Sequence, residues 1–319
     1  MHKIHEEQLY AMKRKKNRIS IDIEYFFFLQ AMYVAKMLPM KFCYNIAELC
    51  GRLFFIFDFR HRNRVIQHLL HAGIAKDRKE AVLLGRKNFI HFAKVIADIF
   101  VCRQFMKPEN ISEILRIDGP EISRELFFSP GKSKPVIIVC AHFGNWEMAG
   151  QGYTISSGIP LMSVMRPFDN PKIGKYIVAR RTGHAHEVCD KKGAIKPLLT
   201  ALKKGSSVAI LADQHAGTAE GVVVNFFGHP ARTHSSPALL HLKTGTPILI
   251  LMPRRVSDDF HFEFIISEPI TLTPTGNKEE DVKTLVQRYT AEAEKIIARY
   301  PEQWMWAHRR WLDINRKSE

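Results

Sequence analysis

Apolar residues in the second half of the chain form short runs that are typical of buried strands. The run at 136–140 (Val-Ile-Ile-Val-Cys) contains no polar residue, and later runs repeat this character. A continuous apolar run of about four to eight residues is the pattern of a strand that is covered on both faces. The predicted strands lie at 136–140, 208–211, 222–224, 247–251 and 261–266. The last of them begins by alternating polar with apolar residues, so we expect it nearer an edge of the sheet.

Stretches with apolar residues at helical spacing separate these strands, and a further helical region precedes them. The predicted helices lie within 61–106 and at about 172–182, 193–204, 235–244 and 280–299. Strands and helices that alternate in this way indicate a sheet with helices on its faces. The predicted fold class is therefore α/β, with a mostly buried mixed sheet flanked by helices.

Residues 21–57 are the most apolar part of the chain, and Pro39 divides them. Charged residues interrupt this region, so no uncharged run reaches the roughly 18 residues of a transmembrane helix. We predict two helices against a membrane interface, because aromatic-rich helices beside a basic segment are typical of interfacial anchors. Each Lys or Arg of the basic segment at 13–18 adds about 1 kcal/mol of attraction to anionic lipid. The alternatives are a core helix with a solvated tail, and a single membrane crossing near 23–40.

These patterns divide the chain into parts without a long linker or an internal repeat. Residues 1–20 are predicted to be a basic N-terminal tail, and residues 21–60 a layer of membrane-associated hydrophobic helices. Residues 61–319 are predicted to form one α/β domain with a helical lead-in.

The charge balance indicates anionic partners. The chain has 319 residues with 47 Lys and Arg against 32 Asp and Glu, a formal net charge of +15. Such a surplus attracts nucleic acid, an anionic membrane surface, or an acidic protein or phosphorylated substrate. No helix-turn-helix, zinc-finger or RNA-binding signature is visible, which disfavours nucleic acid. The five cysteines contain no CxxC pair, so neither a disulfide framework nor a zinc site is expected, and no metal site is predicted.

The segment Ala141–Glu147 holds the candidate chemistry. It follows directly on the predicted strand at 136–140, and its Gly144 and Asn145 supply turn and helix-capping chemistry. On one continuous helix His142 and Glu147 would point about 140° apart, so they meet only if His142 sits on the turn and Glu147 in the first helical turn. A carboxylate paired to one imidazole nitrogen leaves the other nitrogen as a proton acceptor. The helix N-terminus beside it offers backbone N–H groups to an oxyanion.

The motif His142-x4-Glu147, in the form HFGNWE, resembles the HX4(D/E) motif of the lysophospholipid acyltransferase superfamily. In this wording it is similar to the bacterial lipid A late acyltransferases. Further blocks resemble that family in the same order along about residues 22–312. These blocks are Met165–Pro171 (MRPFDNP), Lys192–Ala194 (KGA), Leu211–Gln214 (LADQ), Asn225–Thr233 (NFFGHPART) and Pro301–Trp311 (PEQWMWAHRRW).

The resemblance implies an acyltransferase of lipid A, and hence lipopolysaccharide, biosynthesis. It would move a fatty acyl group from a thioester, commonly that of acyl carrier protein, to a hydroxyl of a lipid A precursor or related glycolipid. His142 would act as the general base, and Glu147 would orient it. Arg166 and Asp213 are the next candidates by family match. Arg166 would hold a phosphate of the acceptor or donor, and Asp213 would anchor a basic partner or position the acceptor. Gly144, Asn145 and Thr233 are also carried over as substrate-binding residues.

The resemblance also implies partners and a location. The expected partners are acyl carrier protein, a glycolipid acceptor and an anionic membrane surface, with no cofactor beyond the acyl thioester and no nucleic acid. The expected location is the cytoplasmic face of the bacterial inner membrane, peripheral or single-pass. Two alternatives stay open: a phospholipid or phosphatidylinositol mannoside acyltransferase, and a non-enzymatic basic protein that binds membranes or nucleic acid.

Overall fold

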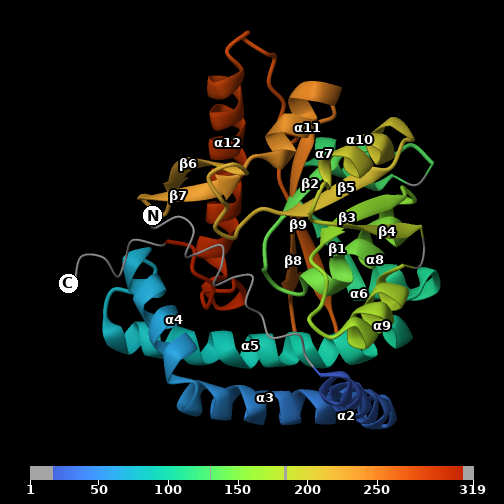
Figure 1. Ribbon diagram of the computed structural model, residues 1–319, viewed down its shortest axis with the longest axis vertical. Helices are drawn as coiled ribbons and strands as arrows, with labels where there is room; N and C mark the ends of the chain where they lie inside the picture. The colour runs from blue at the N-terminus through green and yellow to red at the C-terminus, as the bar shows by residue number, and fades with distance from the viewer. Residues whose placement is uncertain (1–16, 130, 183–184, 312–319) are drawn as a thin grey trace.

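The computed structural model describes residues 17–129, 131–182 and 185–311. Most of the predicted basic tail, residues 1–16, lies outside these ranges. Within the described residues, seven strands form one sheet in the order β1-β9-β8-β2-β5-β3-β4 (Figure 1). The strands are β1 (Leu115–Asp118), β2 (Ile137–Cys140), β3 (Leu161–Met165), β4 (His186–Asp190), β5 (Ser207–Leu211), β8 (Ile248–Arg255) and β9 (Phe262–Ile266).

The sheet is mixed and mostly parallel, which confirms the predicted fold class. Strands β8, β2, β5, β3 and β4 run in one direction, whereas β9 is antiparallel to β8 and carries β1 parallel to itself. The predicted strand at 222–224 does not join this sheet. It belongs to β6 (Gly221–Phe226), which pairs antiparallel with β7 (His229–His234) in a separate hairpin that packs on α12 (Lys278–Arg299).

Both faces of the sheet are covered, and its central strand β2 is apolar at every position. In β2 the side chains of Ile137 and Val139 enter one core cluster, while those of Ile138 and Cys140 enter the other. This is the alternation of side chains that the period of two along a strand imposes. The helices on the two faces are α10 (Ile195–Lys203), α11 (Ser236–Thr244) and α12 with the first cluster, and α6 (Ile111–Ile114), α7 (Glu121–Phe128) and α8 (Trp146–Ser157) with the second.

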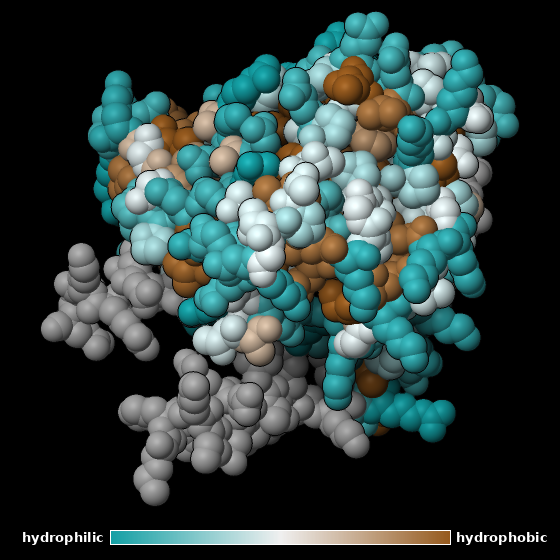
Figure 2. All heavy atoms as spheres, turned by 90° about the horizontal axis from the view of Figure 1, so that it is seen from above, coloured by the Kyte–Doolittle hydropathy of each residue, from teal (hydrophilic) through white to brown (hydrophobic). Residues whose placement is uncertain are grey.

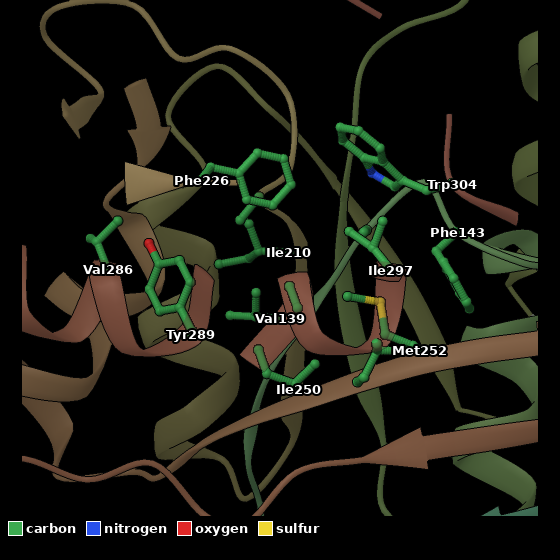
Figure 3. Close-up of a cluster of buried hydrophobic side chains, with 14 of the residues drawn as sticks. Val139, Phe143, Ile210, Phe226, Ile250, Met252, Val286, Tyr289, Ile297 and Trp304 are labelled. Atoms are coloured by element: carbon green, nitrogen blue, oxygen red, sulfur yellow. The ribbon is translucent and has the colours of Figure 1, made fainter. Parts of the chain in front are cut away.

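The first cluster extends to the edge of the sheet where the candidate chemistry lies. Figure 3 shows Val139 and Ile250 of the sheet packed among Tyr289 and Ile297 of α12, with Trp304 beside them. Two further helices lie at the same end of the strands: α9 (Pro171–Arg181) and the short helix at Pro301–Gln303. This packing fixes the ends of the strands that carry the site.

The predicted N-terminal layer is helical. It consists of α2 (Arg18–Met37), α3 (Met40–Phe57), α4 (Phe59–His71) and α5 (Arg78–Phe105), and α3 lies along α5 beneath the sheet (Figure 1). A Cβ atom on Gly51 of α3 would lie 2.6 Å from the Cα atom of Ile90 in α5, so glycine allows this close approach. Pro39 separates α2 from α3 as the sequence predicts.

Helices α2 and α3 expose an unusually large number of apolar side chains. We call this set the apolar face of α2 and α3. Its members are Ile19, Ile23, Phe26, Phe27, Tyr33, Val34 and Met37 on α2, and Phe42, Ile46, Leu49, Leu53, Phe54, Ile56 and Phe57 on α3. Seen from the opposite end of the molecule, hydrophilic residues cover most of the surface (Figure 2).

The alternative of a membrane crossing near 23–40 is wrong for this structure. Among the residues that the structure describes, no helix has both the length and the apolar character needed to cross a membrane. The physical reason lies in α2 itself, which carries Asp22, Glu24 and Lys36 and ends before Pro39.

Candidate active site

The ends of two neighbouring parallel strands bring the candidate chemistry together. β2 and β5 pair in register, with Cys140 opposite Leu211, so the residues that follow them lie side by side. His142 follows β2 and Asp213 follows β5, although 71 residues separate them in the sequence. The carboxyl ends of parallel strands are the usual place for functional residues in open α/β sheets.

The His142 ring is held by Asp213 at one nitrogen and contacts Gln214 at the other. Its Nδ1 atom lies 2.9 Å from Oδ1 of Asp213, and its backbone N–H donates to Oδ2 of the same carboxylate at 2.9 Å. A carboxylate at Nδ1 favours the tautomer that carries its proton there. Nε2 is then an acceptor, and it lies 3.2 Å from Nε2 of the Gln214 amide.

The C-terminal segment covers this pair from the other side. The indole Nε1–H of Trp304 donates to Oδ2 of Asp213 at 2.9 Å, and the backbone N–H of Met305 donates to the carbonyl of His142 at 3.0 Å. The side chains of His142 and Asp213 are 17% and 7% exposed, so the pair is largely shielded while the imidazole keeps some access to solvent. A shielded, hydrogen-bonded carboxylate is well suited to fix an imidazole in one orientation.

The electrostatics of the pair favour a basic imidazole. Burial lowers the pKa of His142, but the charge and the hydrogen bond of Asp213, together with the charge of Glu147, outweigh burial and raise that pKa above its ordinary value of 6.5. Burial raises the pKa of Asp213, yet His142 and the hydrogen bonds from His142 and Trp304 bring it down to about 2. Asp213 is therefore ionised at neutral pH and makes His142 a stronger proton acceptor.

The turn around His142 has the predicted form. His142 lies on the turn after β2, and Glu147 lies in the first turn of α8, as the spacing requires. Asn145 is the N-cap of α8, and its side chain accepts from the backbone N–H of Met148 at 3.2 Å. Gly144 has a φ of +54°, and a Cβ atom there would lie 1.7 Å from the carbonyl oxygen of Pro253, so only glycine fits.

The predicted partner of His142 requires a correction. Glu147 was expected to orient the imidazole, but the residue that bonds the ring is Asp213. The carboxylate of Glu147 is instead bound by Arg181 of α9, whose Nε–H donates to Oε2 at 2.9 Å while Nη2 contacts both oxygens. Because α8 turns Glu147 toward α9, its influence on His142 is that of a nearby charge.

The predicted substrate-binding residues also fall into different roles. The carboxylate of Asp213 bonds His142 and Trp304, and its contact with an acceptor stays a prediction. Gly144, Asn145 and Thr233 are buried, and Thr233 Oγ1 accepts from the guanidinium of the buried Arg310. Contact of these three residues with a substrate stays a prediction.

Arg166 remains a candidate for substrate contact. It directly follows β3, at the same edge of the sheet as His142, and its side chain is exposed. Its contact with a phosphate stays a prediction. Among the described residues, no group of His, Cys, Asp and Glu side chains is arranged to hold a metal ion.

A cavity opens beside His142 between α8 and the sheet. It is small, about 70 Å³, and Trp146, whose ring centroid is 5.3 Å from that of His142, lies at its near end. Glu147 and Arg181 line this cavity and also a second one, which is bounded by Phe28 and Met32 of α2. The rest of the first cavity wall is mainly apolar. It includes Ile138, Cys140, Ala149, Gly150, Tyr153, Leu161, Ala209, Leu211 and Leu251.

Comparison with known proteins identifies the class. The chain matches the family model of the bacterial lipid A biosynthesis acyltransferases over residues 12–313, nearly its whole length. The protein is therefore an acyltransferase. It belongs to the bacterial lipid A biosynthesis acyltransferase family, which confirms the resemblance seen in the sequence motifs.

Individual relatives are distant. The lipid A biosynthesis lauroyltransferase of Escherichia coli (strain K12) is 25% identical over 281 residues, which make up 88% of this chain and 88% of that protein. The phosphatidylinositol mannoside acyltransferase of Mycolicibacterium smegmatis is 25% identical over 180 residues, covering 55% of this chain and 56% of that protein. Among solved structures, the 1-acyl-sn-glycerophosphate acyltransferase of Thermotoga maritima is 14% identical with a TM-score of 0.32, covering 78% of this chain and 97% of that one.

Proposed function

We propose that this chain transfers a fatty acyl group from the thioester of an acyl carrier protein to a hydroxyl of a lipid A precursor. The observation that carries the proposal is the imidazole of His142, oriented by Asp213 and placed beside a mainly apolar cavity. The E. coli relative that aligns over 88% of this chain is a lipid A biosynthesis lauroyltransferase, which supports both the acyl group and the acceptor. The net charge of +15 supports an acidic donor protein and a phosphorylated acceptor.

In the proposed reaction His142 acts as the general base. Its Nε2 atom takes the proton of the acceptor hydroxyl while the hydroxyl oxygen attacks the thioester carbonyl. The oxygen–carbonyl bond forms, the carbon–sulfur bond then breaks, and the proton passes from the imidazolium to the departing thiolate. Asp213 stabilises the imidazolium in between, since it is already ionised and hydrogen-bonded to Nδ1.

The start of α8 supports stabilisation of the negative charge that develops on the thioester oxygen. The N-terminus of α8 begins at Trp146, four residues after His142, and the positive end of a helix dipole favours a negative charge. Glu147 lies in the same turn, but its carboxylate is neutralised by the bidentate contact with Arg181. We therefore propose that the Glu147–Arg181 pair maintains the shape of the cavity entrance and that Arg181 offsets the negative charge of Glu147 there.

The cavity beside His142 is the proposed place for the acyl chain. The register of the sheet orders its wall by depth: Leu211 of β5 pairs with Cys140 near His142, Ala209 pairs with Ile138 and Ser163, and Ser207 pairs with Leu161. At about 3.3 Å per residue, the strand from Leu211 to Ser207 gives a depth of roughly 13 Å. Tyr153, whose hydroxyl lies 2.7 Å from Oγ of Ser207, lines this cavity.

This geometry predicts that Ala209→Leu shortens the acyl chain that is transferred, because the added carbons occupy the middle of the cavity. The measurement is a competition among acyl carrier protein thioesters of graded chain length, with the products separated by mass spectrometry. Ala219→Leu, at an exposed position, is the matched control and should leave the length distribution unchanged. An unaltered distribution for Ala209→Leu, with transfer intact, would place the acyl chain elsewhere.

The apolar face of α2 and α3 is the proposed contact with the membrane surface. Burying one large apolar side chain contributes about 1.5–3 kcal/mol, so the exposed side chains of these two helices together can hold the protein at an interface. The second cavity lies between α2, which contributes Phe28 and Met32, and the Glu147–Arg181 pair. Its position supports entry of lipid from the side of α2.

We expect Phe54→Glu on α3 to lower binding to vesicles that contain anionic lipid by tenfold or more, since it replaces a 62%-exposed apolar ring with a charge. Co-sedimentation measures this directly. Ile195→Glu on α10 is the control, because that exposed apolar residue lies on the far side of the molecule from α3 (Figure 1). Equal loss of binding in both variants would contradict an interface formed by α2 and α3.

The function itself is tested by supplying acyl carrier protein thioesters and separate acceptors to the purified protein. The proposal expects an acylated lipid A precursor, detected by mass spectrometry, and its absence with His142→Ala. Acylation of a phosphatidylinositol mannoside in place of the lipid A precursor would instead support the function of the mycobacterial relative. No acylated product from any of these acceptors would overturn the proposal.

A further inference from the structure

Helix α5 presents a buried polar stripe to the two loops of the active site. Asn88, His91 and Asp98 lie at intervals of three and seven residues, so they share one face of the helix. Their exposed fractions are 2%, 6% and 0%. Burying polar groups is costly unless they are hydrogen-bonded, so the partners of this stripe reveal what it does.

Each member of the stripe bonds to a loop of the site. The amide of Asn88 donates to the carbonyl of Trp304 at 2.7 Å, and Trp304 is the residue that bonds Asp213. Nε2 of His91 lies 3.2 Å from the carbonyl oxygen of Gly144. Burial lowers the pKa of His91 to about 3, so this ring is neutral and donates from Nε2.

Asp98 bonds three partners from different elements. Its Oδ2 atom accepts from the Nδ2–H of Asn145 at 2.8 Å, and the Oδ1 atom of the same Asn145 amide caps α8. The guanidinium of Arg255 in β8 bonds the same carboxylate oxygen, and the hydroxyl of Tyr44 in α3 donates to Oδ1 at 2.6 Å. Asp98 therefore ties the turn that carries His142 to the sheet and to the helix beneath it.

We propose that Asp98 is a positioning residue for the acyl-transfer reaction, acting through Asn145 to hold the His142 turn in its reactive geometry. The proposal rests on the function proposed above. A buried ion pair such as Asp98–Arg255 is weak support for stability, because apolar residues of similar volume often stabilise as well. A role in positioning the His142 turn explains this pair better, since a displacement of about 1 Å at a reacting group can lower the rate about 100-fold.

The decisive variant is Asn145→Ser. Serine is a good N-cap, so it can still bond the N–H of Met148, but it has no amide to offer Asp98. We expect the variant to fold and kcat to fall about 10- to 100-fold, with the KM for the donor unchanged. The midpoint of the acid limb of the pH profile should stay at its wild-type value, since Asp213 is untouched.

A paired exchange makes the test specific. Asp98→Asn should lower kcat in the same way, and the double variant Asp98→Asn with Asn145→Asp should recover most of it, because one carboxylate and one amide again face each other beside Arg255. Ser123→Ala removes another buried hydrogen bond, to the carbonyl of Ser267 after β9, at the opposite edge of the sheet, and serves as the control for lost stability.

Wild-type kcat in Asn145→Ser, or a thermal destabilisation like that of Ser123→Ala without loss of kcat, would overturn the positioning role while leaving acyl transfer intact. Failure of the wild-type protein to transfer an acyl group would instead refute the proposed function.

Discussion

Replacing His142 with alanine is expected to lower kcat for acyl transfer about 10²–10⁴-fold, the range over which a general base contributes. The expectation rests on the ring's position: Nδ1 is held by Asp213, Nε2 is left as an acceptor that contacts the Gln214 amide, and the ring lies beside Trp146, which lines the cavity. No other group among the described residues combines these features. The loss should appear at saturating donor and acceptor, because binding of neither substrate depends on proton transfer.

The control for this variant is His261→Ala. His261 is a half-exposed histidine paired with Asp259 in the loop after β8, so its loss tests whether removing any imidazole lowers the rate. The thermal unfolding midpoint should be unchanged for His261→Ala, within experimental error, and modestly shifted for His142→Ala. Near-normal transfer by a folded His142→Ala protein would exclude His142 as the base.

Asp213→Asn is expected to produce the second large effect. An amide at this position can present its own N–H to the imidazole, which favours the wrong tautomer, and a comparable change in a serine protease triad costs about 10⁴-fold in kcat. Glu147→Gln should have the smaller effect, because Glu147 bonds Arg181 and acts on His142 only through its charge. Steady-state kinetics of the two variants side by side therefore rank the two acids. A larger loss for Glu147→Gln would restore the sequence-based assignment of Glu147 as the orienting acid.

The pH dependence of activity tests the same assignment through the direction in which its midpoint shifts. His142 must be neutral to accept a proton, and its pKa lies above 6.5, so wild-type activity should fall as pH drops through a midpoint above 6.5. In Asp213→Asn the charge and hydrogen bond of Asp213, which raise the pKa of His142, are lost, while burial, which lowers that pKa, and the charge of Glu147 remain. The remaining activity should therefore persist to lower pH than in the wild type. A midpoint that does not move would show that Asp213 does not set the basicity of the ring.

The fold class, the turn after β2 and the first two helices could be predicted from the sequence because each depends on local chemistry. The apolar runs at 136–140 and 247–251 predict covered strands, and β2 and β8 are buried on both faces. Gly144 and Asn145 predict a strand-to-helix turn, and the structure has one with Asn145 as the cap. Pro39 predicts the break between the first two helices.

The partner of His142 could not be predicted in the same way. The sequence assigns that role to Glu147 alone, because Glu147 is close to His142 in the chain and belongs to the family motif, and it assigns Asp213 to a basic partner or the acceptor. The choice depends on β5 being the neighbour of β2, and strand order is set by the packing of the whole sheet rather than by any local pattern. The one available signal was that Asp213, like His142, directly follows a buried strand.

The polar stripe of α5 was also invisible in the sequence. The helical spacing of its apolar residues, such as Phe92 and Val95, indicates a packed helix, and a buried Asp on such a helix is uncommon. Asp98 is buried because its partners, Asn145 and Arg255, arrive from elements far along the chain. Long-range contacts of this kind follow from the assembled fold.

The most direct test of the account is a nitrogen-15 NMR titration of the His142 ring in the wild-type, Asp213→Asn and Glu147→Gln proteins. We predict that the neutral wild-type ring carries its proton on Nδ1 and titrates above pH 6.5, that Asp213→Asn moves the titration strongly to lower pH, and that Glu147→Gln moves it less. A wild-type ring that titrates at or below 6.5, or one that responds to Glu147→Gln and not to Asp213→Asn, would contradict the account.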